Sequence, residues 1–133
     1  NWLHQRRFTV ECFSNGTLPY PKWAIEKVSF IMDWKLPGSG ENPRNEQRIV
    51  NLNHMLGYDH AVKFVTKDLD DLRLAQDLWS RYLRGRDIEV FAGVVWGTLQ
   101  NSELCKWIMD NKLPWRLNIQ MHNYIWDRNM RGI

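Results

Sequence analysis

The sequence predicts an α/β fold in which a parallel sheet is built from repeated βα units. Apolar runs of strand length alternate along the chain with stretches whose apolar residues recur at helical spacing. Strands and helices that alternate in this way form parallel sheets with right-handed crossovers. With 133 residues the chain has room for one domain, and we expect residues 1–133 to form it.

Five strands are expected, and each is followed by a turn or by polar residues. They cover residues 8–12, 28–32, 61–65, 88–91 and 115–120. An Asn-Gly turn at Asn15 and Gly16 follows the first strand, and a loop rich in Pro and Gly, residues 36–43, follows the second.

Helices are expected between these strands. They are a helix end at residues 1–7, a single turn at 22–26, and longer helices at 43–56, after Asp68, and at 101–111. Asn42 and Pro43 mark the start of the first long helix and Gly57 its end. The helix capped by Asp68 has one apolar face, made of Leu72, Ala75, Leu78, Trp79 and Tyr82.

The composition is that of an ordinary globular domain, with 44% hydrophobic and 25% charged residues. A net charge of +3, with both signs interspersed, is too small to indicate nucleic-acid binding. The two cysteines, Cys12 and Cys105, have no metal-ligand spacing. No stretch reaches the ~20 apolar residues of a membrane span. We therefore expect a cytoplasmic protein with neither a membrane nor a nucleic-acid partner.

Polar residues and glycines follow the ends of all five predicted strands. In an open α/β sheet the ligand binds outside the carboxyl ends of the strands. The candidates, in chain order, are Ser14, Asn15, Asp33, Lys35, Thr66, Lys67, Gly93 and His122. Their convergence locates a site but does not identify its chemistry.

The C-terminal stretch 118–126 begins as an alternating strand and ends in an aromatic turn. Its apolar residues are expected to enter the core, namely Leu117, Ile119 and Met121. Gln120 and His122 would then share the opposite face, because side chains alternate along a strand. The alternative is that His122 satisfies a core hydrogen bond or lies on the surface.

Each candidate also has a simpler structural interpretation. The Asn-Gly segment can be only a turn, Asp33 and Lys35 can form a solvated ion pair, and a glycine can merely relieve crowding. The group Asp68, Asp70 and Asp71 is best explained as helix-start charge rather than as a metal site. No phosphate-binding glycine motif and no Ser/His/Asp or Cys/His arrangement stands out, so no catalytic residue is assigned.

Five segments of the chain occur in a familiar order. They are Phe13-Ser-Asn-Gly-Thr17 with Pro19, Met32-Asp-Trp-Lys-Leu-Pro-Gly-Ser-Gly40, Asp59-His-Ala-Val-Lys-Phe-Val65, Phe91-Ala-Gly-Val-Val-Trp-Gly97 and Gln120-Met-His-Asn-Tyr-Ile-Trp126. Together they resemble the C-terminal portion of 7-carboxy-7-deazaguanine synthase. Members of that family are radical S-adenosylmethionine (SAM) enzymes that contract a pterin ring during synthesis of queuosine and other 7-deazaguanines.

The resemblance implies that the chain is the C-terminal part of an incomplete, TIM-like radical-SAM barrel. The family's three cluster cysteines and its Gly-Gly-Glu methionine-binding motif lie upstream, and neither occurs here. The chain is therefore expected to be a fragment or a piece of a split protein. It would be inactive alone and would act as a radical-SAM lyase when joined to its N-terminal part. The 4Fe–4S cluster and Mg²⁺ would be bound only through that part, so no metal ligand is assigned.

The resemblance also assigns binding roles to individual residues. Those expected to contact S-adenosylmethionine are Ser14, Asn15, Asp33, Trp34, Lys35, Gly93, Val94, Val95 and Trp96. Gln120 and His122 match the family's Gln-x-His motif and would contact the substrate, 6-carboxy-tetrahydropterin, on its way to 7-carboxy-7-deazaguanine. The chain departs from the family pattern in three places, at Phe13, at Gly93-Val94 and at Asn123.

Two other functions stay open at this stage. One is a different radical-SAM enzyme, such as an activase that abstracts hydrogen from a protein glycine, and binding of 6-carboxy-tetrahydropterin separates the two. The other is a non-enzymatic α/β binding module. The protein partner would be a second copy of the chain, in a homodimer, or a complementary N-terminal half.

Overall fold

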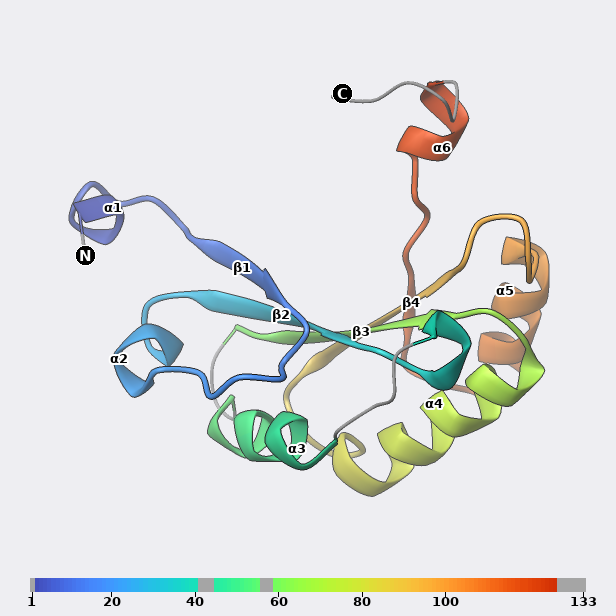
Figure 1. Cartoon of the computed structure of the whole chain (residues 1–133), viewed down its shortest axis with the longest axis horizontal. Helices are drawn as coiled ribbons and strands as arrows, with labels where there is room; N and C mark the ends of the chain where they lie inside the picture. Colours follow the sequence, from blue (N-terminus) through green and yellow to red (C-terminus); the bar gives the residue numbers. More distant parts are fainter. Residues whose placement is uncertain (1, 41–44, 56–58, 127–133) are drawn as a thin grey trace.

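A computed structural model describes residues 2–40, 45–55 and 59–126. Within them, five parallel strands form one sheet in the sequential order β1-β2-β3-β4-β5 (Figure 1). The strands are β1 (Glu11–Ser14), β2 (Ser29–Trp34), β3 (Ala61–Thr66), β4 (Glu89–Val94) and β5 (Arg116–Leu117). The predicted α/β fold with a parallel sheet of βα units is confirmed.

Helices connect successive strands and gather on one face of the sheet. The connecting helices are α2 (Lys22–Ile25), the 3-10 helix η1 (Pro37–Ser39), α3 (Asn45–His54), α4 (Leu69–Tyr82) and α5 (Asn101–Asp110). Two short helices do not connect strands: α1 (Trp2–Gln5) precedes β1 and α6 (His122–Ile125) follows β5. In Figure 1, α2, α3 and α4 lie below the sheet and α5 lies at its right-hand end. Sequential parallel strands with right-handed crossovers require this one-sided arrangement. The described connecting helices therefore leave the opposite face of the sheet uncovered.

The hydrophobic core lies between the sheet and these helices. Alternate residues of the central strands are buried there: Phe30, Met32, Trp34, Val62, Phe64, Val90 and Ala92. They meet buried helix residues, among them Leu52 of α3 and Leu104 of α5. Leu72, Ala75 and Leu78 of α4 are also buried there and have the predicted helical spacing. Trp34 is fully buried, and its indole N–H donates to Asn45 Oδ1 at 3.0 Å. This bond attaches the start of α3 to β2.

The predicted starts of two long helices are confirmed. The Asp68 carboxylate accepts hydrogen bonds from the backbone N–H groups of Asp70 and Asp71, at 3.1 and 3.0 Å, and so caps α4. A capping box formed by Gln100 and Glu103 begins α5. For α3, the predicted start signals Asn42 and Pro43 and the end signal Gly57 lie outside the described residues.

Strand boundaries differ from the prediction. β1 covers Glu11–Ser14 rather than 8–12, because this edge strand is defined by its pairing with β2 and not by its apolar residues. β2 and β4 run past their predicted ends, since their ladders to β3 continue as far as Trp34 and Val94. β5 is limited to Arg116–Leu117, where it pairs with Phe91 and Ala92 of β4.

The prediction that the chain continues as a strand to residue 120 is wrong. After β5 the backbone N–H of Asn118 still donates to the carbonyl of Ala92 at 2.7 Å, and the segment then leaves the sheet toward α6 (Figure 1). Ile119 and Met121 are 44% and 65% exposed instead of buried. Because α6 begins at His122, Gln120 and His122 are not alternate residues of one strand.

Candidate functional site

The uncovered face of the sheet carries charged side chains. The strand register places Asp33 beside Lys63, Lys63 beside Phe91 and Phe91 beside Arg116, in one row across four strands. Residues of one row point to the same face, and this row alternates with the buried core residues. We call this surface the bare face and define it by Asp33, Lys35, Lys63, Glu89, Phe91 and Arg116.

Asp33 and Lys35 form an ion pair at the carboxyl end of β2. Lys35 Nζ lies 2.9 Å from Asp33 Oδ2, and each side chain is only 28% exposed. The other carboxylate oxygen, Asp33 Oδ1, is buried and accepts no hydrogen bond from the described residues. A buried carboxylate oxygen without a donor costs free energy. The pair is therefore half-buried rather than fully solvated, and Asp33 Oδ1 is an acceptor that a bound ligand can use.

The residues after β1 form the tight turn that the sequence predicts. Ser14 Oγ accepts the N–H of Gly16 at 3.1 Å. Asn15 Oδ1 accepts both the N–H and the hydroxyl of Thr17, at 3.2 and 2.8 Å. The Asn15 side chain is exposed, and its amide nitrogen donates to none of the described residues. The turn thus presents a donor beside the bare face.

The loop after β4 approaches the C-terminal segment. A Cβ added at Gly93 would lie 2.7 Å from the carbonyl oxygen of Asn118, so this glycine permits a close backbone approach. Val94, Trp96 and Tyr124 help to line a cavity of about 300 Å³. The rings of Trp96 and Tyr124 meet edge to face, with centroids 5.1 Å apart. The structure therefore brings the predicted loop near the C-terminal motif.

Other predicted site residues are held by structural contacts. The Trp34 side chain is fully buried on the helix side of the sheet, so only its main chain can reach a ligand on the bare face. Val95 donates its N–H to the carbonyl of Thr66 at 2.9 Å. Gln120 Oε1 accepts from Asn123 Nδ2 at 2.8 Å. The side chain of His122 lies outside what the structure describes.

The remaining two candidates also make structural contacts. The Thr66 hydroxyl is fully buried and donates to the carbonyl of Gly93 at 3.1 Å, which ties β3 to β4. The N–H of Lys67 donates to Asp71 Oδ2 at 3.0 Å. These two hydrogen bonds order the carboxyl end of β3 and the residue that follows it.

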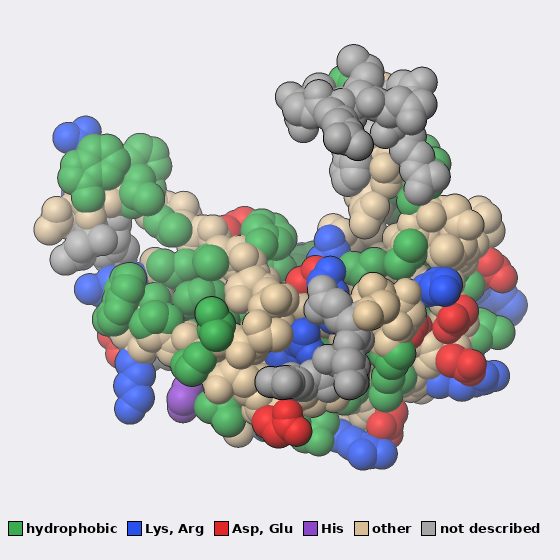
Figure 2. Space-filling model, viewed as in Figure 1, with side chains coloured by type: hydrophobic (Ala, Val, Ile, Leu, Met, Phe, Trp, Pro, Cys, Tyr) green, Lys and Arg blue, Asp and Glu red, His purple; other side chains and the backbone are tan. Residues whose placement is uncertain are grey.

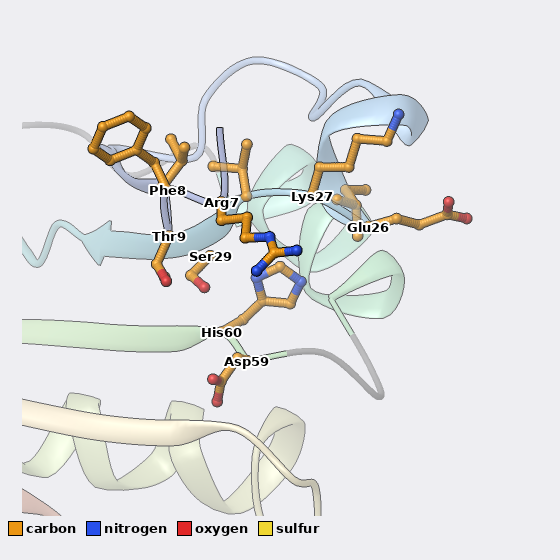
Figure 3. Close-up of a pocket in the computed structure, with 11 residues that line it drawn as sticks. Arg7, Phe8, Thr9, Glu26, Lys27, Ser29, Asp59 and His60 are labelled. Carbon is orange, nitrogen blue, oxygen red and sulfur yellow. The ribbon is translucent and has the colours of Figure 1, made fainter. Parts of the chain in front are cut away.

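A larger cavity, of about 520 Å³, lies at the opposite, amino end of β2 and β3. In Figure 3 the Arg7 guanidinium points toward the His60 ring, with Thr9, Ser29 and Asp59 nearby, while Lys27 and Glu26 point away. No predicted site residue lines this cavity. Since parallel sheets bind ligands at the carboxyl ends of their strands, the smaller cavity and the bare face form the better candidate site.

His60 at the amino end ties two strands together and should make stability depend on pH. Its Nδ1 accepts the N–H of Phe30 at 3.0 Å, so this nitrogen must stay unprotonated. Burial lowers the pKa of His60 from its ordinary value of 6.5, and the carboxylate of Asp59 opposes the shift. The unfolded chain therefore binds a proton that the folded chain does not.

We expect the contribution of His60 to the free energy of unfolding to be fully present above pH 6.5. The free energy of unfolding should then fall as the pH drops below that value. Urea unfolding between about pH 8 and about pH 5 measures this effect in the wild type and in His60→Gln, which cannot be protonated. The stability difference between the two proteins should shrink in acid. A difference that is the same at every pH would show that His60 does not titrate with folding.

Comparison with curated proteins gives three informative relatives, all named 7-carboxy-7-deazaguanine synthase. The protein of Clostridium acetobutylicum is 31% identical over an alignment of 127 positions, which covers 93% of this chain and 56% of the relative. That of Chlorobaculum tepidum is 30% identical over an alignment of 136 positions, which covers 98% of this chain and 59% of the relative. That of Methanospirillum hungatei is 30% identical over 116 residues, 87% of this chain and 46% of the relative. The chain is a homologue of the 7-carboxy-7-deazaguanine synthases.

The resemblance seen in the sequence motifs is thereby confirmed. The chain spans about half the length of the synthases it matches, which is consistent with a C-terminal portion of such an enzyme. No family model and no solved structure matches the chain.

In this synthase homologue, the sequence motifs indicated the loops of the candidate site but not the charged strand residues of the bare face. Lys63, Glu89 and Arg116 lie within strands, and Arg116 Nη2 pairs with Glu89 Oε1 at 2.7 Å across β4 and β5. The available signal was a charge in the middle of each apolar run, which indicates a strand with one polar face. Two buried polar residues of α3, Arg48 and Asn51, were also missed.

Two further findings concern metals and membranes in the described ranges of this homologue. No group of three His, Cys, Asp or Glu side chains in them could hold a metal ion. Cys12 lies in β1 and Cys105 in α5. Among the same residues, no helix has both the length and the apolar character needed to span a bilayer.

Proposed function

We propose that the chain is the C-terminal part of a radical-SAM lyase that converts 6-carboxy-tetrahydropterin to 7-carboxy-7-deazaguanine. The observation that supports it most is the shared name of five relatives, which align with 81–98% of this chain. Residues 1–133 would form one domain that lacks the cluster-binding N-terminal part. The proposal keeps the cytoplasmic location expected from the sequence.

In this proposal the sheet is part of an incomplete barrel whose inner surface is the bare face. Parallel sheets are normally covered on both faces, whereas here half-buried charges occupy the face opposite the helices. Closure into a barrel would turn these charges toward an enclosed site, as in other barrels of parallel strands. Strands of the N-terminal part would pair with the edge of β1 that has no described neighbour.

Exposed apolar side chains near that edge favour the same arrangement. Figure 2 shows hydrophobic side chains gathered over α1, β1 and α2. Four aromatic residues contribute, with exposed fractions of 60% for Trp2, 55% for Phe8, 67% for Phe13 and 67% for Trp23. Apolar clusters of this kind mark interaction surfaces. The N-terminal part would cover them, and a second copy of the chain is the alternative partner.

S-adenosylmethionine would bind at the carboxyl ends of β1, β2 and β4. The residues fit it, because the buried Asp33 Oδ1 can accept from a hydroxyl or ammonium group and the Asn15 amide can donate. Lys35 would hold Asp33 in place, and residues 93–96 and the main chain of Trp34 would complete the wall. When bound beside a reduced iron–sulfur cluster, the cofactor supplies the carbon radical that abstracts a substrate hydrogen atom.

The iron–sulfur cluster itself does not fit the residues of this chain. A 4Fe–4S cluster needs several closely spaced thiolates, whereas Cys12 and Cys105 belong to separate elements. We therefore derive no step through the cluster from these residues. Their contribution is to orient the adenosyl group, to hydrogen-bond it and to exclude water.

The pterin substrate would lie toward the C-terminal segment. Gln120 and His122 would contact its edge, because amide and imidazole groups can donate as well as accept hydrogen bonds. The edge-to-face pair of Trp96 and Tyr124 supplies an aromatic wall in the same region. The bound ring would thus lie between the loop after β4 and α6.

Lys35→Ala tests the cofactor site. The variant removes the partner of a half-buried carboxylate, and we expect SAM to bind about 1–3 kcal/mol more weakly. Lys106→Ala is the matched control, since Lys106 pairs with Asp110 at 2.8 Å on the exposed surface of α5. Calorimetric titration with SAM compares the two variants in the complete enzyme. Equal affinity in both variants would assign the Asp33–Lys35 pair to a purely surface role.

A chimeric enzyme tests the whole proposal. This chain replaces the matching part of the Clostridium acetobutylicum synthase, and the product is reconstituted anaerobically with iron and sulfide. The chimera should form 7-carboxy-7-deazaguanine, whereas the chain alone should not. A chimera that holds its cluster and cleaves SAM without turning over the pterin would contradict the substrate assignment and favour a different radical-SAM enzyme.

A further inference from the structure

Two buried polar residues of α3 hold the loop that follows β1. Arg48 is 1% exposed and Asn51 is fully buried, and their i, i+3 spacing puts them on one face of the helix. Arg48 Nε donates to the carbonyl of Asn15 at 2.8 Å. Asn51 Nδ2 donates to the carbonyls of Gly16 and Leu18, at 3.0 and 2.9 Å.

The same loop is also bound through its N–H groups. Asn51 Oδ1 accepts the N–H of Tyr20 at 3.0 Å and the side chain of Gln47 at 3.1 Å. The amide of Asn51 therefore uses all of its donors and acceptors. Four backbone groups between residues 15 and 20 depend on these two side chains.

Burial of the Arg48 side chain costs free energy. Its Nη1 is buried and donates to no described residue, so the side chain carries a charge and a missing hydrogen bond into the core. An apolar side chain of similar length would fill this space without that cost. An apolar side chain could not donate the hydrogen bond to the Asn15 carbonyl, which holds the turn from the side of α3.

We propose that Arg48 and Asn51 are positioning residues that hold the Asn15–Thr17 turn in the conformation that contacts S-adenosylmethionine. The inference rests on the proposed function. Asn15 presents its side chain outward while its main chain is held from the helix side, so the direction of the amide depends on α3. Neither residue touches the ligand in this arrangement.

Arg48→Met tests, in the full chain, whether Arg48 orders the turn. Loss of the bond to Asn15 should raise amide hydrogen exchange several-fold at Gly16 and Thr17, whose N–H groups bond within the turn. Tyr20 is the internal control, because Asn51 still holds its N–H. Unchanged exchange at Gly16 and Thr17 would overturn the proposal, whatever happens to the melting temperature.

The second readout is the affinity for SAM, measured by calorimetry. Arg48→Met should bind about 3- to 10-fold more weakly, the effect of one hydrogen bond. Arg81→Met should bind as the wild type does, since Arg81 is 65% exposed and pairs only with Asp77 on α4. If Arg48→Met does not fold, Arg48→Lys should shift both readouts in the same direction.

These two readouts test separately whether Arg48 orders the turn and whether the turn contacts SAM. If the chain joined to its N-terminal part binds no SAM, the proposed function is contradicted, while the exchange measurement still decides whether Arg48 orders the turn. Faster exchange with unchanged affinity would show that the turn is ordered by α3 but does not contact SAM, and would overturn this inference.

Discussion

Gly16→Ala should lower the free energy of unfolding by about 2–5 kcal/mol, through backbone strain and overpacking together. Gly16 has a φ of +70°, a region that L-residues rarely adopt. An added Cβ would also overlap the Sδ atom of Met32 and lie 3.2 Å from Cγ of Arg48. Both neighbours are buried, so neither can move away cheaply. Urea unfolding monitored by tryptophan fluorescence measures the loss.

Gly85→Ala separates the two causes. Gly85 has a similar φ of +79°, but no atom lies within 4 Å of its Cβ position. Only the strain of the left-handed conformation applies there, about 1–2 kcal/mol. The excess loss in Gly16→Ala measures the close packing of the turn against Met32 and Arg48. Equal losses in the two variants would contradict that packing.

Asp71→Ala should cost about 2–4 kcal/mol, because a buried carboxylate is lost and two part-buried N–H groups lose their acceptor. Asp71 is only 3% exposed. Its Oδ1 accepts the N–H of Gly38 at 3.1 Å, and its Oδ2 accepts the N–H of Lys67 at 3.0 Å. One carboxylate thus holds together the loops that follow β2 and β3, at the carboxyl ends of the strands. Affinity for SAM should fall as well, since Lys35 precedes the first of these loops.

Asp70→Ala is the matched control from the same turn of α4. The Asp70 side chain is 90% exposed and pairs with Arg73 at 2.8 Å. Its removal should change stability by no more than about 0.5 kcal/mol. Equal effects at the two positions would show that Asp71 acts only as a helix-start charge.

The two aspartates illustrate what the sequence could predict. The first turn of a helix favours acidic residues for electrostatic reasons, so Asp70 and Asp71 looked equivalent next to the predicted cap, Asp68. Asp68 is indeed the cap. Asp71 differs because its partners come from Gly38 and Lys67, and a bond to a residue 33 positions away leaves no trace in local spacing.

The α/β fold with a parallel sheet was predictable because it depends on local periodicity. β2 and β3 were predicted from apolar runs of strand length, and Phe30, Met32, Val62 and Phe64 are all buried. The stretch after β5 was predicted as an alternating strand, yet Ile119 is exposed. An edge strand has one neighbour only, and its length depends on how far that neighbour continues rather than on its own pattern.

The central claim is that the carboxyl ends of β1, β2 and β4 form a wall for SAM, and residue-resolved NMR tests it most directly. SAM is added to the ¹⁵N-labelled chain joined to its N-terminal part, and amide shifts of this chain are followed to saturation. The account predicts shifts at Asn15, at Asp33 and Lys35, and at residues 93–96. The amino-end cavity, reported by Thr9, Ser29 and His60, should not respond. Shifts confined to that cavity, or no shifts at any concentration, would contradict the account.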